Sequence, residues 1–191
     1  MRVSREQAAE NRARIVAVAA TLFRQKGFDG IGVADIMQAA ALTHGGFYGH
    51  FKSKDDLAAQ ASRAALATSV AKWEEIAAAE GDTSYAALVA SYLRPAHRDH
   101  AGKGCALTAL GGDAARQGKP LRAAFREGLT RLVDILAAAV PGTKAARRRR
   151  ALAAMSQMVG AIVLARAVDD AALSDEILAA ARHDLLARDG V

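Results

Sequence analysis

Apolar residues recur every three or four positions along almost the whole chain, which is the spacing of one face of an α-helix. In the first such segment, Ile15, Ala19 and Phe23 share a face. Ser4, a preferred helix N-cap, precedes this segment, and Gly27, a residue that favours helix ends, follows it. No segment alternates apolar and polar residues as a half-buried strand does. The pattern therefore predicts an all-α protein.

Breaks at glycine, proline and capping residues divide the chain into nine predicted helices. Their expected ranges are 4–26, 33–40, 44–50, 54–79, 84–93, 105–117, 120–140, 144–168 and 174–188. Residues 94–104 contain Pro95 and two glycines and are expected to form a loop. The first three helices have the order of a helix-turn-helix with a supporting helix. We therefore expect a helix-turn-helix domain at 1–53, with its motif at about 32–51, and a second helical domain at 54–191.

Composition excludes several other classes of protein. Apolar residues make up 52% of the 191 residues, aromatic residues only 5%, and Pro occurs three times, which argues against a β-sandwich, a disordered chain and a collagen-like chain. The single Cys excludes a disulfide framework and fits a reducing compartment. The longest stretch without a charged residue, Ile36–Phe51, is too short to span a bilayer, and the N-terminus has no signal-peptide pattern. We expect a soluble, cytoplasmic protein with no membrane partner.

The charge is unevenly distributed along the chain. The formal net charge is +6. Residues 1–54 carry eight Lys or Arg against four Asp or Glu, whereas residues 55–191 carry 18 against 16. A basic excess suits a polyanionic partner, although a generally basic surface would give the same total.

The third predicted helix carries the strongest functional signal. Phe47 and Phe51 are four residues apart, so one face packs in the core and the other residues face outward. Three of these residues are glycines, and each costs an α-helix roughly 1 kcal/mol relative to Ala. A helix whose backbone approaches a phosphate or a base edge has a reason to accept that cost. With Lys52 and Lys54 directly behind it, the segment favours contact with nucleic acid.

The segment Leu42–Leu57, LTHGGFYGHFKSKDDL, resembles the DNA-binding domain of the TetR/AcrR family of transcriptional regulators. The resemblance covers about residues 12–61, and the rest of the chain matches the family only as a pattern of helices. It implies a sequence-specific regulator, of repressor type, that binds double-stranded DNA and is released by a small-molecule effector. Because the family forms homodimers, it also implies a palindromic operator, with neither enzymatic activity nor a cofactor.

The resemblance assigns roles to individual residues. Thr43, His44, Gly45 and Gly46 would face the major groove, Tyr48, His50 and Lys54 would contact phosphates, and Lys52 completes the predicted DNA-binding set. The sequence departs from the family at two positions. Gly32 stands where many relatives have a capping Ser or Thr, and Gly46 has no side chain to touch a base.

The effector pocket implied for the second domain would draw on its large apolar and polar-tipped residues. The predicted lining residues are Trp73, Tyr85, Leu88, Tyr92, Cys105, Leu110, Phe125, Leu129, Met155 and Met158. Each of these residues has ordinary core packing as its alternative.

A dimer interface is predicted from the last two helices. Leu152, Met155, Val159 and Ile162 are spaced like the seam of a coiled coil, while Val163 and Leu164 lie on another face. The last helix adds Ile177, Ala181 and Leu185. Two such helices from each of two chains would form a two-fold four-helix interface. The alternative is a helix pair buried in a single core.

Two further functions remain as alternatives. Cys105 lies at the predicted start of a helix beside Lys103, a setting that lowers a thiol pKa and would suit a redox- or electrophile-sensing regulator. His97, His100 and Cys105 also have a spacing that could hold a metal, although we predict no metal site. The other alternative is a helical protein-interaction module that does not bind DNA. We find no nucleophile–base pair, P-loop or dinucleotide-binding fingerprint, so we expect no enzyme.

Overall fold

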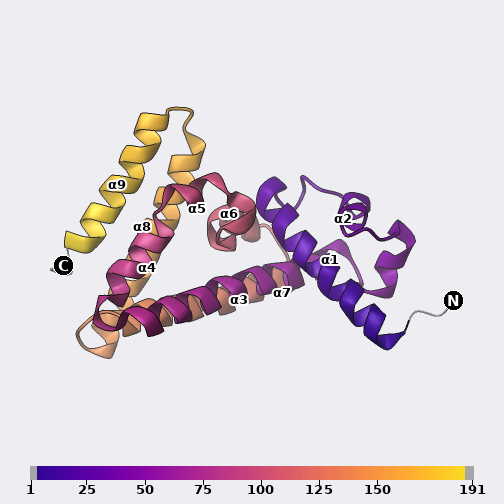
Figure 1. The fold of residues 1–191 in the computed structure, drawn as a ribbon, viewed down its shortest axis with the longest axis horizontal. Coiled ribbons are helices and arrows are strands. Elements are labelled where there is room, and N and C mark those ends of the chain that lie inside the picture. The colour runs from indigo at the N-terminus through magenta and orange to yellow at the C-terminus, as the bar shows by residue number, and fades with distance from the viewer. Residues whose placement is uncertain (1–3, 188–191) are drawn as a thin grey trace.

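The structure is a computed structural model that describes residues 4–187, and these residues form helices joined by short turns (Figure 1). The elements are α1 (Arg5–Lys26), α2 (Val33–Ala39), the 3₁₀-helix η1 (His44–Gly49), α3 (Lys54–Glu80), η2 (Gly81–Thr83), α4 (Ser84–Tyr92), α5 (Pro95–Asp99), η3 (Ala101–Lys103), α6 (Ala106–Ala114), α7 (Lys119–Ala138), α8 (Lys144–Ala167) and α9 (Ala171–Ala187). No strand occurs in this range, so the predicted all-α fold is confirmed. None of these helices is long and apolar enough to cross a membrane.

Local chemistry explains where α1 begins and ends. The Ser4 hydroxyl accepts a hydrogen bond from the Gln7 amide at 3.1 Å, which satisfies one free donor of the first turn. At the other end Gly27 has a φ of 75°, a conformation that favours glycine, and its amide donates to the Phe23 carbonyl at 2.8 Å. Both predicted boundaries of the first helix are confirmed.

The turn between α2 and η1 is tight. Ala41 has a φ of 56°, in the left-handed region that few residues with a side chain adopt. The Leu42 amide donates to the Met37 carbonyl across the turn at 2.9 Å. The third helix was expected to be α-helical, but η1 is a 3₁₀-helix of six residues. Its three glycines weaken the preference for an α-helix, and 3₁₀-helices occur as short pieces of this kind.

The second domain is built on α3 and α7, which lie side by side over much of their length (Figure 1). Gly128 on α7 allows this close approach, because a Cβ atom there would lie 2.7 Å from the Cβ of Leu66 on α3. Helices α8 and α9 pair with each other and α8 also contacts α7, which completes the domain.

The segment between α4 and α6 contains more helix than predicted. Residues 94–104 were expected to form a loop, but they contain α5 and η3. Pro95 stands in the first turn of α5, where its missing amide hydrogen is not needed. The prediction was wrong because proline and glycine were taken as breaks, whereas here they begin and separate short helices.

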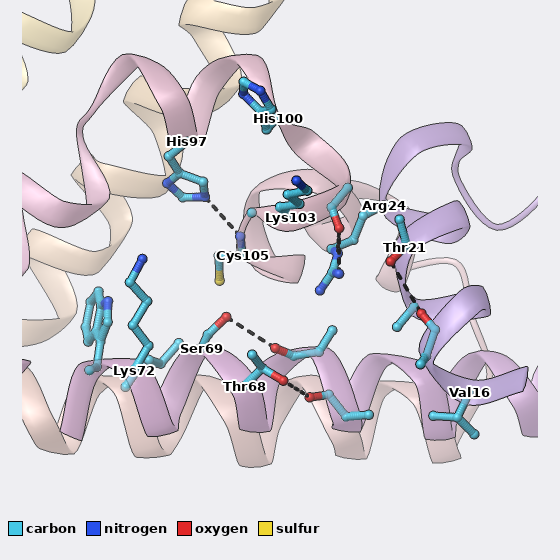
Figure 2. Close-up of a pocket in the computed structure, with 18 of the residues that line it drawn as sticks. Val16, Thr21, Arg24, Thr68, Ser69, Lys72, His97, His100, Lys103 and Cys105 are labelled. Atoms are coloured by element: carbon cyan, nitrogen blue, oxygen red, sulfur yellow. Dashed lines mark hydrogen bonds between the residues drawn. The ribbon is translucent and has the colours of Figure 1, made fainter. Parts of the chain in front are cut away.

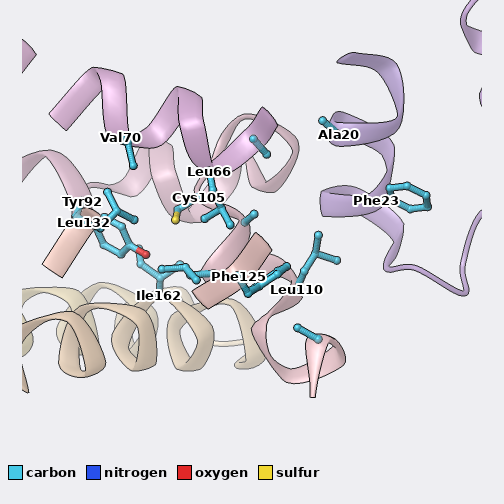
Figure 3. Packing of buried hydrophobic residues seen from close by; sticks show 14 of the residues in the cluster. Ala20, Phe23, Leu66, Val70, Tyr92, Cys105, Leu110, Phe125, Leu132 and Ile162 are labelled. Carbon is cyan, nitrogen blue, oxygen red and sulfur yellow. The ribbon is translucent and has the colours of Figure 1, made fainter. Parts of the chain in front are cut away.

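One continuous apolar core joins the first domain to the second (Figure 3). Phe23 and Ala20 on α1 and Leu110 on α6 are buried members of the same cluster. Helix α1 also contacts η3, and Arg24 donates two hydrogen bonds to the Gly102 carbonyl, at 3.0 Å from Nε and 2.6 Å from Nη2. The helix that supports η1 is therefore fixed against the second domain. The boundary at residue 53 stays a prediction.

Candidate DNA-binding surface and effector pocket

The predicted DNA-binding residues lie together on one surface around η1. Thr43, His44, Gly45, Gly46, Tyr48 and Lys52 are exposed, and His50 and Lys54 are partly exposed. Tyr48 has 72% of its surface exposed although it is aromatic. Phe47 and Phe51 are buried beneath them with ring centroids 5.6 Å apart, and they anchor the segment to the core.

Packing inside the protomer does not require the glycines of η1. A Cβ atom built on Gly45 or Gly49 meets nothing within 4 Å, and one on Gly46 makes only ordinary contacts. Neither Gly45 nor Gly49 has a positive φ. The free protein would therefore accept alanine at both positions, and the bare backbone remains available to a partner that approaches from outside.

The start of α3 is capped by its own side chains. The Ser53 hydroxyl accepts from the Asp56 amide at 3.1 Å, and the Asp56 carboxylate accepts from the Lys52 amide at 3.1 Å. The hydrogen bond from the Lys52 amide, and another from the Gln60 side chain, lower the pKa of Asp56.

Asp35 compensates for the missing N-cap side chain at Gly32. The Asp35 carboxylate accepts a hydrogen bond from the Gly32 amide at 3.1 Å. The beginning of α2 is thus stabilised from within the helix.

A pocket of about 1030 Å³ lies between α1, α3 and the segment from α4 to η3 (Figure 2). Three predicted pocket residues, Trp73, Tyr92 and Cys105, line it. Sequence reasoning missed the contribution of α1, whose Arg12, Val16, Ala20 and Arg24 also line it. These four residues are spaced four apart, and that stripe of small and cationic residues was the available signal.

The other predicted pocket residues have different surroundings. Phe125, Leu129 and Met155 line a second hollow of about 490 Å³. Tyr85, Leu88, Leu110 and Met158 line neither of the two pockets and are buried in the core. Their burial fits the alternative of ordinary packing, and their assignment to an effector pocket stays a prediction.

His97 is a buried structural group. The Cys105 amide donates to His97 Nε2 at 2.9 Å, so the neutral ring carries its proton on Nδ1, which lies 2.7 Å from the Tyr92 carbonyl. Burial lowers the pKa of His97 to about 4, and the positive charge of Arg166 adds to this effect. With both ring nitrogens occupied, His97 has no electron pair left for a metal, and residues 4–187 contain no cluster of potential metal ligands.

Cys105 differs from the reactive thiol considered above. It is the N-cap residue of α6 and is buried. Burial raises the pKa of the Cys105 thiol. The expectation of a lowered pKa was wrong because desolvation outweighs the hydrogen bonds to the thiol, which include those from the backbone at the start of α6.

Comparison with known proteins agrees with this geometry. The family model described as bacterial regulatory proteins, tetR family, matches residues 15–61. This match covers about a quarter of the chain and lies in the predicted DNA-binding domain. The HTH-type transcriptional regulator AcrR of Shigella flexneri is 41% identical over 56 residues, which are 29% of this chain and 26% of AcrR. The HTH-type transcriptional repressor KstR2 of Rhodococcus jostii is 34% identical over 91 residues, which are 42% of this chain and 45% of KstR2. The matched part of this chain thus spans less than half the length of either relative.

Solved TetR-family structures share the whole fold. A TetR-family regulator from Agrobacterium tumefaciens has a TM-score of 0.79 at 22% identity, over 95% of this chain and 98% of that one. The reduced form of NemR from E. coli has a TM-score of 0.78 at 20% identity, over 92% of this chain and 95% of that one. At these identities the likeness describes the fold, which extends through the second domain.

The exposed face of α8 differs from the predicted TetR/AcrR dimer seam. Met155 and Ile162 are buried in the protomer core, as are Ala181 and Leu185 on α9, so these four side chains already pack within one protomer, and their assignment to an interface stays a prediction. Ile177 is only partly buried. The outward stripe of α8 consists of Leu152, Ser156, Val159 and Val163, which repeat the coiled-coil spacing in another register.

Arg166 explains why α8 faces this way. It donates to the Arg98 carbonyl at 2.9 Å, to the His97 carbonyl at 2.5 Å and to the Thr108 hydroxyl at 3.2 Å. Arg166 therefore ties α8 to α5 and α6, and it turns the face that contains Met155 and Ile162 into the core.

Proposed function

We propose that this TetR/AcrR-family protein is a sequence-specific DNA-binding transcriptional regulator of repressor type. The observation that carries the proposal is η1, a glycine-rich segment with an exposed tyrosine and histidine, anchored by two buried phenylalanines and followed by two lysines. A repressor of this kind works beside the chromosome, in the cytoplasm. Its role is binding rather than catalysis.

The surface residues divide into two groups by chemistry. Thr43 and His44 offer side-chain donors and acceptors that suit base edges in the major groove. Gly45 and Gly46 let the backbone come close to the duplex. Tyr48, His50, Lys52 and Lys54 suit phosphates, which fix the position of the protein but carry no sequence information.

A homodimer would present two copies of η1 to the duplex. The outward stripe of α8, with exposed apolar residues that nothing in the protomer covers, supports association through this helix and α9. Two-fold symmetry in the protein calls for a palindromic operator.

The pocket beside α1 supports control by a small molecule. Its wall includes both α1 and α3, so a ligand that changes the spacing of these helices changes the position of η1. A ligand that prefers the conformation with misplaced η1 segments weakens operator binding by the same coupling energy, about 1–3 kcal/mol for a 5–150-fold effect.

Selection of duplexes from a random library with the purified protein tests the proposal. We expect a palindromic motif. Tyr48→Phe and Lys54→Ala should then weaken binding to every selected duplex about equally, and Lys54→Ala should lower the salt slope by about one unit. Lys119→Ala, which removes an exposed lysine on α7, is the control and should change neither quantity.

Two results would overturn the proposal. Recovery of duplexes without a shared motif would favour the helical protein-interaction module. Loss at a single base position in Lys54→Ala would contradict a phosphate contact.

A further inference from the structure

The pocket between α1 and α3 has an unusual distribution of charge. Five cationic residues line it, namely Arg12, Arg24, Lys72, Arg94 and Lys103, and no Asp or Glu does. None of the five forms an ion pair with a carboxylate in the part of the chain that the structure describes. Figure 2 shows Arg24, Lys72 and Lys103 around the same space, although they come from different elements. The lining therefore contains several positive charges and no carboxylate, and the negative charges that act on Arg12 and Lys72, those of Asp56 and Glu75, lie outside it.

The cations that are partly removed from water are held by neutral groups only. Arg12 Nη2 donates to the Gln60 side-chain oxygen at 2.6 Å, and Arg24 donates to the Gly102 carbonyl. Burial and the charge of Arg94 lower the pKa of Lys72. A bound anion would compensate these charges, and binding would cost little further desolvation of Arg24 because that side chain is already partly buried.

One buried polar atom of a pocket residue lacks a hydrogen-bond partner. Arg12 Nη1 is buried without a hydrogen bond, while the guanidinium carbon lies 4.6 Å from the centroid of the Phe51 ring. Buried polar groups are normally satisfied, so an unpartnered one at a pocket indicates a place for a ligand oxygen.

The apolar part of the lining indicates that the rest of the ligand is apolar. Trp73 and Tyr92 meet edge to face with ring centroids 5.6 Å apart, and Leu132 lies in the same lining. A volume of about 1030 Å³ is far larger than an inorganic ion requires and has the size of a pocket for an organic molecule.

We infer that this pocket binds an amphipathic organic acid, with its carboxylate on the cationic side chains and its apolar body against Trp73, Tyr92 and Leu132. Binding of the acid does not depend on the proposed function, but the role of the acid as effector rests on it. Arg12 and Arg24 belong to α1, so a carboxylate that draws them away from Gln60 and Gly102 releases contacts that now fix α1 to the second domain. The ligand charge and the position of η1 are thereby coupled.

Fluorescence of Trp73 provides a direct test, because it is the single tryptophan of the chain and lines the pocket. The full-length protein is titrated with decanoate, with decanamide as the uncharged match, and with acetate and inorganic phosphate as anions without an apolar body. We expect decanoate to bind at least tenfold more tightly than decanamide. Acetate and phosphate should compete only weakly with it.

Two exposed lysines of the pocket are then replaced together. Lys72→Met/Lys103→Met should bring decanoate and decanamide to within threefold of each other and leave decanamide binding intact. Lys119→Met/Lys144→Met removes two exposed lysines outside both pockets and should keep the preference of the wild type. Circular dichroism verifies that both double variants remain folded.

The outcomes separate this inference from the proposed function. Equal affinity for decanoate and decanamide in the wild type, or phosphate that competes as well as decanoate, overturns the organic-acid site. Loss of operator affinity in the ligand-free pocket variant, with the decanoate preference retained, assigns the lysines to DNA and also overturns it. A decanoate preference that depends on the two lysines supports the site even if no operator is found, and in that case the proposed function fails alone.

Discussion

The segment η1 and the outer face of α8 both expose side chains that the protomer does not need, yet their chemistry differs. Five large hydrophobic side chains are exposed among residues 4–187: Tyr48, Leu152, Val163, Leu164 and Leu173. Tyr48 alone belongs to η1, where its neighbours are glycines, histidines and lysines. The other four lie on α8 and at the beginning of α9, and three of them are on α8 itself.

This difference indicates two kinds of partner. A polar surface with one aromatic hydroxyl and an uncovered backbone suits a polyanion with hydrogen-bonding groups. A mostly aliphatic stripe spaced like a coiled-coil seam suits a second apolar surface, and a second copy of the same helix offers one. Exposure alone therefore does not define a function, and the chemistry of the exposed groups has to be considered as well.

Disrupting the α8 face should have the largest effect. Leu152→Glu/Val163→Glu would place up to four charges at a two-fold interface, where unpaired buried charge is costly. We expect a monomer in sedimentation and an operator affinity lower by about 10³-fold or more, close to non-specific binding. Both residues are exposed in the protomer, so the fold should persist.

Ala67→Glu/Ala71→Glu is the matched control for that experiment. It adds the same charge at two exposed positions of α3 and should leave the protein dimeric with unchanged operator affinity. A dimer that survives Leu152→Glu/Val163→Glu would place the interface elsewhere.

Low pH should lower the free energy of unfolding through the buried His97. The pKa of His97 is about 4 in the folded protein, below its ordinary 6.5, so the folded state favours the neutral ring. The stability gained is complete above pH 6.5 and is lost as the pH falls from 6.5 towards 4, by about 3 kcal/mol in total. Urea unfolding of wild type and of His97→Gln measures this. The difference between them should shrink across that range, and a constant difference would contradict the assignment.

The first domain could be predicted from sequence more fully than the second. The ends of α1 depend on Ser4 and Gly27, which act within one helical turn, so local rules suffice. The orientation of α8 depends instead on Arg166, whose partners lie about 60 to 70 positions earlier in the chain. The apolar residues on α8 cover more than one face, so spacing alone could not show which face is buried within the protomer. The pocket was missed in part for the same reason, since α1 meets η3 only in the folded chain.

Replacing His44 should change sequence preference without removing binding. The imidazole is exposed on η1 and offers a donor and an acceptor to a base edge. His44→Ala should cost about 1–3 kcal/mol at one position of each half-site and little at the others. Comparison of motifs selected by wild type and variant from the same random library measures this. An unchanged motif would remove His44 from base recognition.

The smallest expected effect is that of Gly45→Ala, which tests whether the bare backbone of η1 serves the approach to DNA. Gly45 has open space around it and no positive φ, so Gly45→Ala should raise the free energy of unfolding by about 0.4–1 kcal/mol through the unfolded chain. The same methyl group would stand between the backbone and a duplex, so operator affinity should fall. Gly111→Ala on α6, where the space is equally open, should stabilise the protein without any change in operator affinity. Urea midpoints and duplex titrations on the three proteins decide the question. If both alanine variants bind the operator as the wild type does, the glycine at position 45 has no role in approach to DNA.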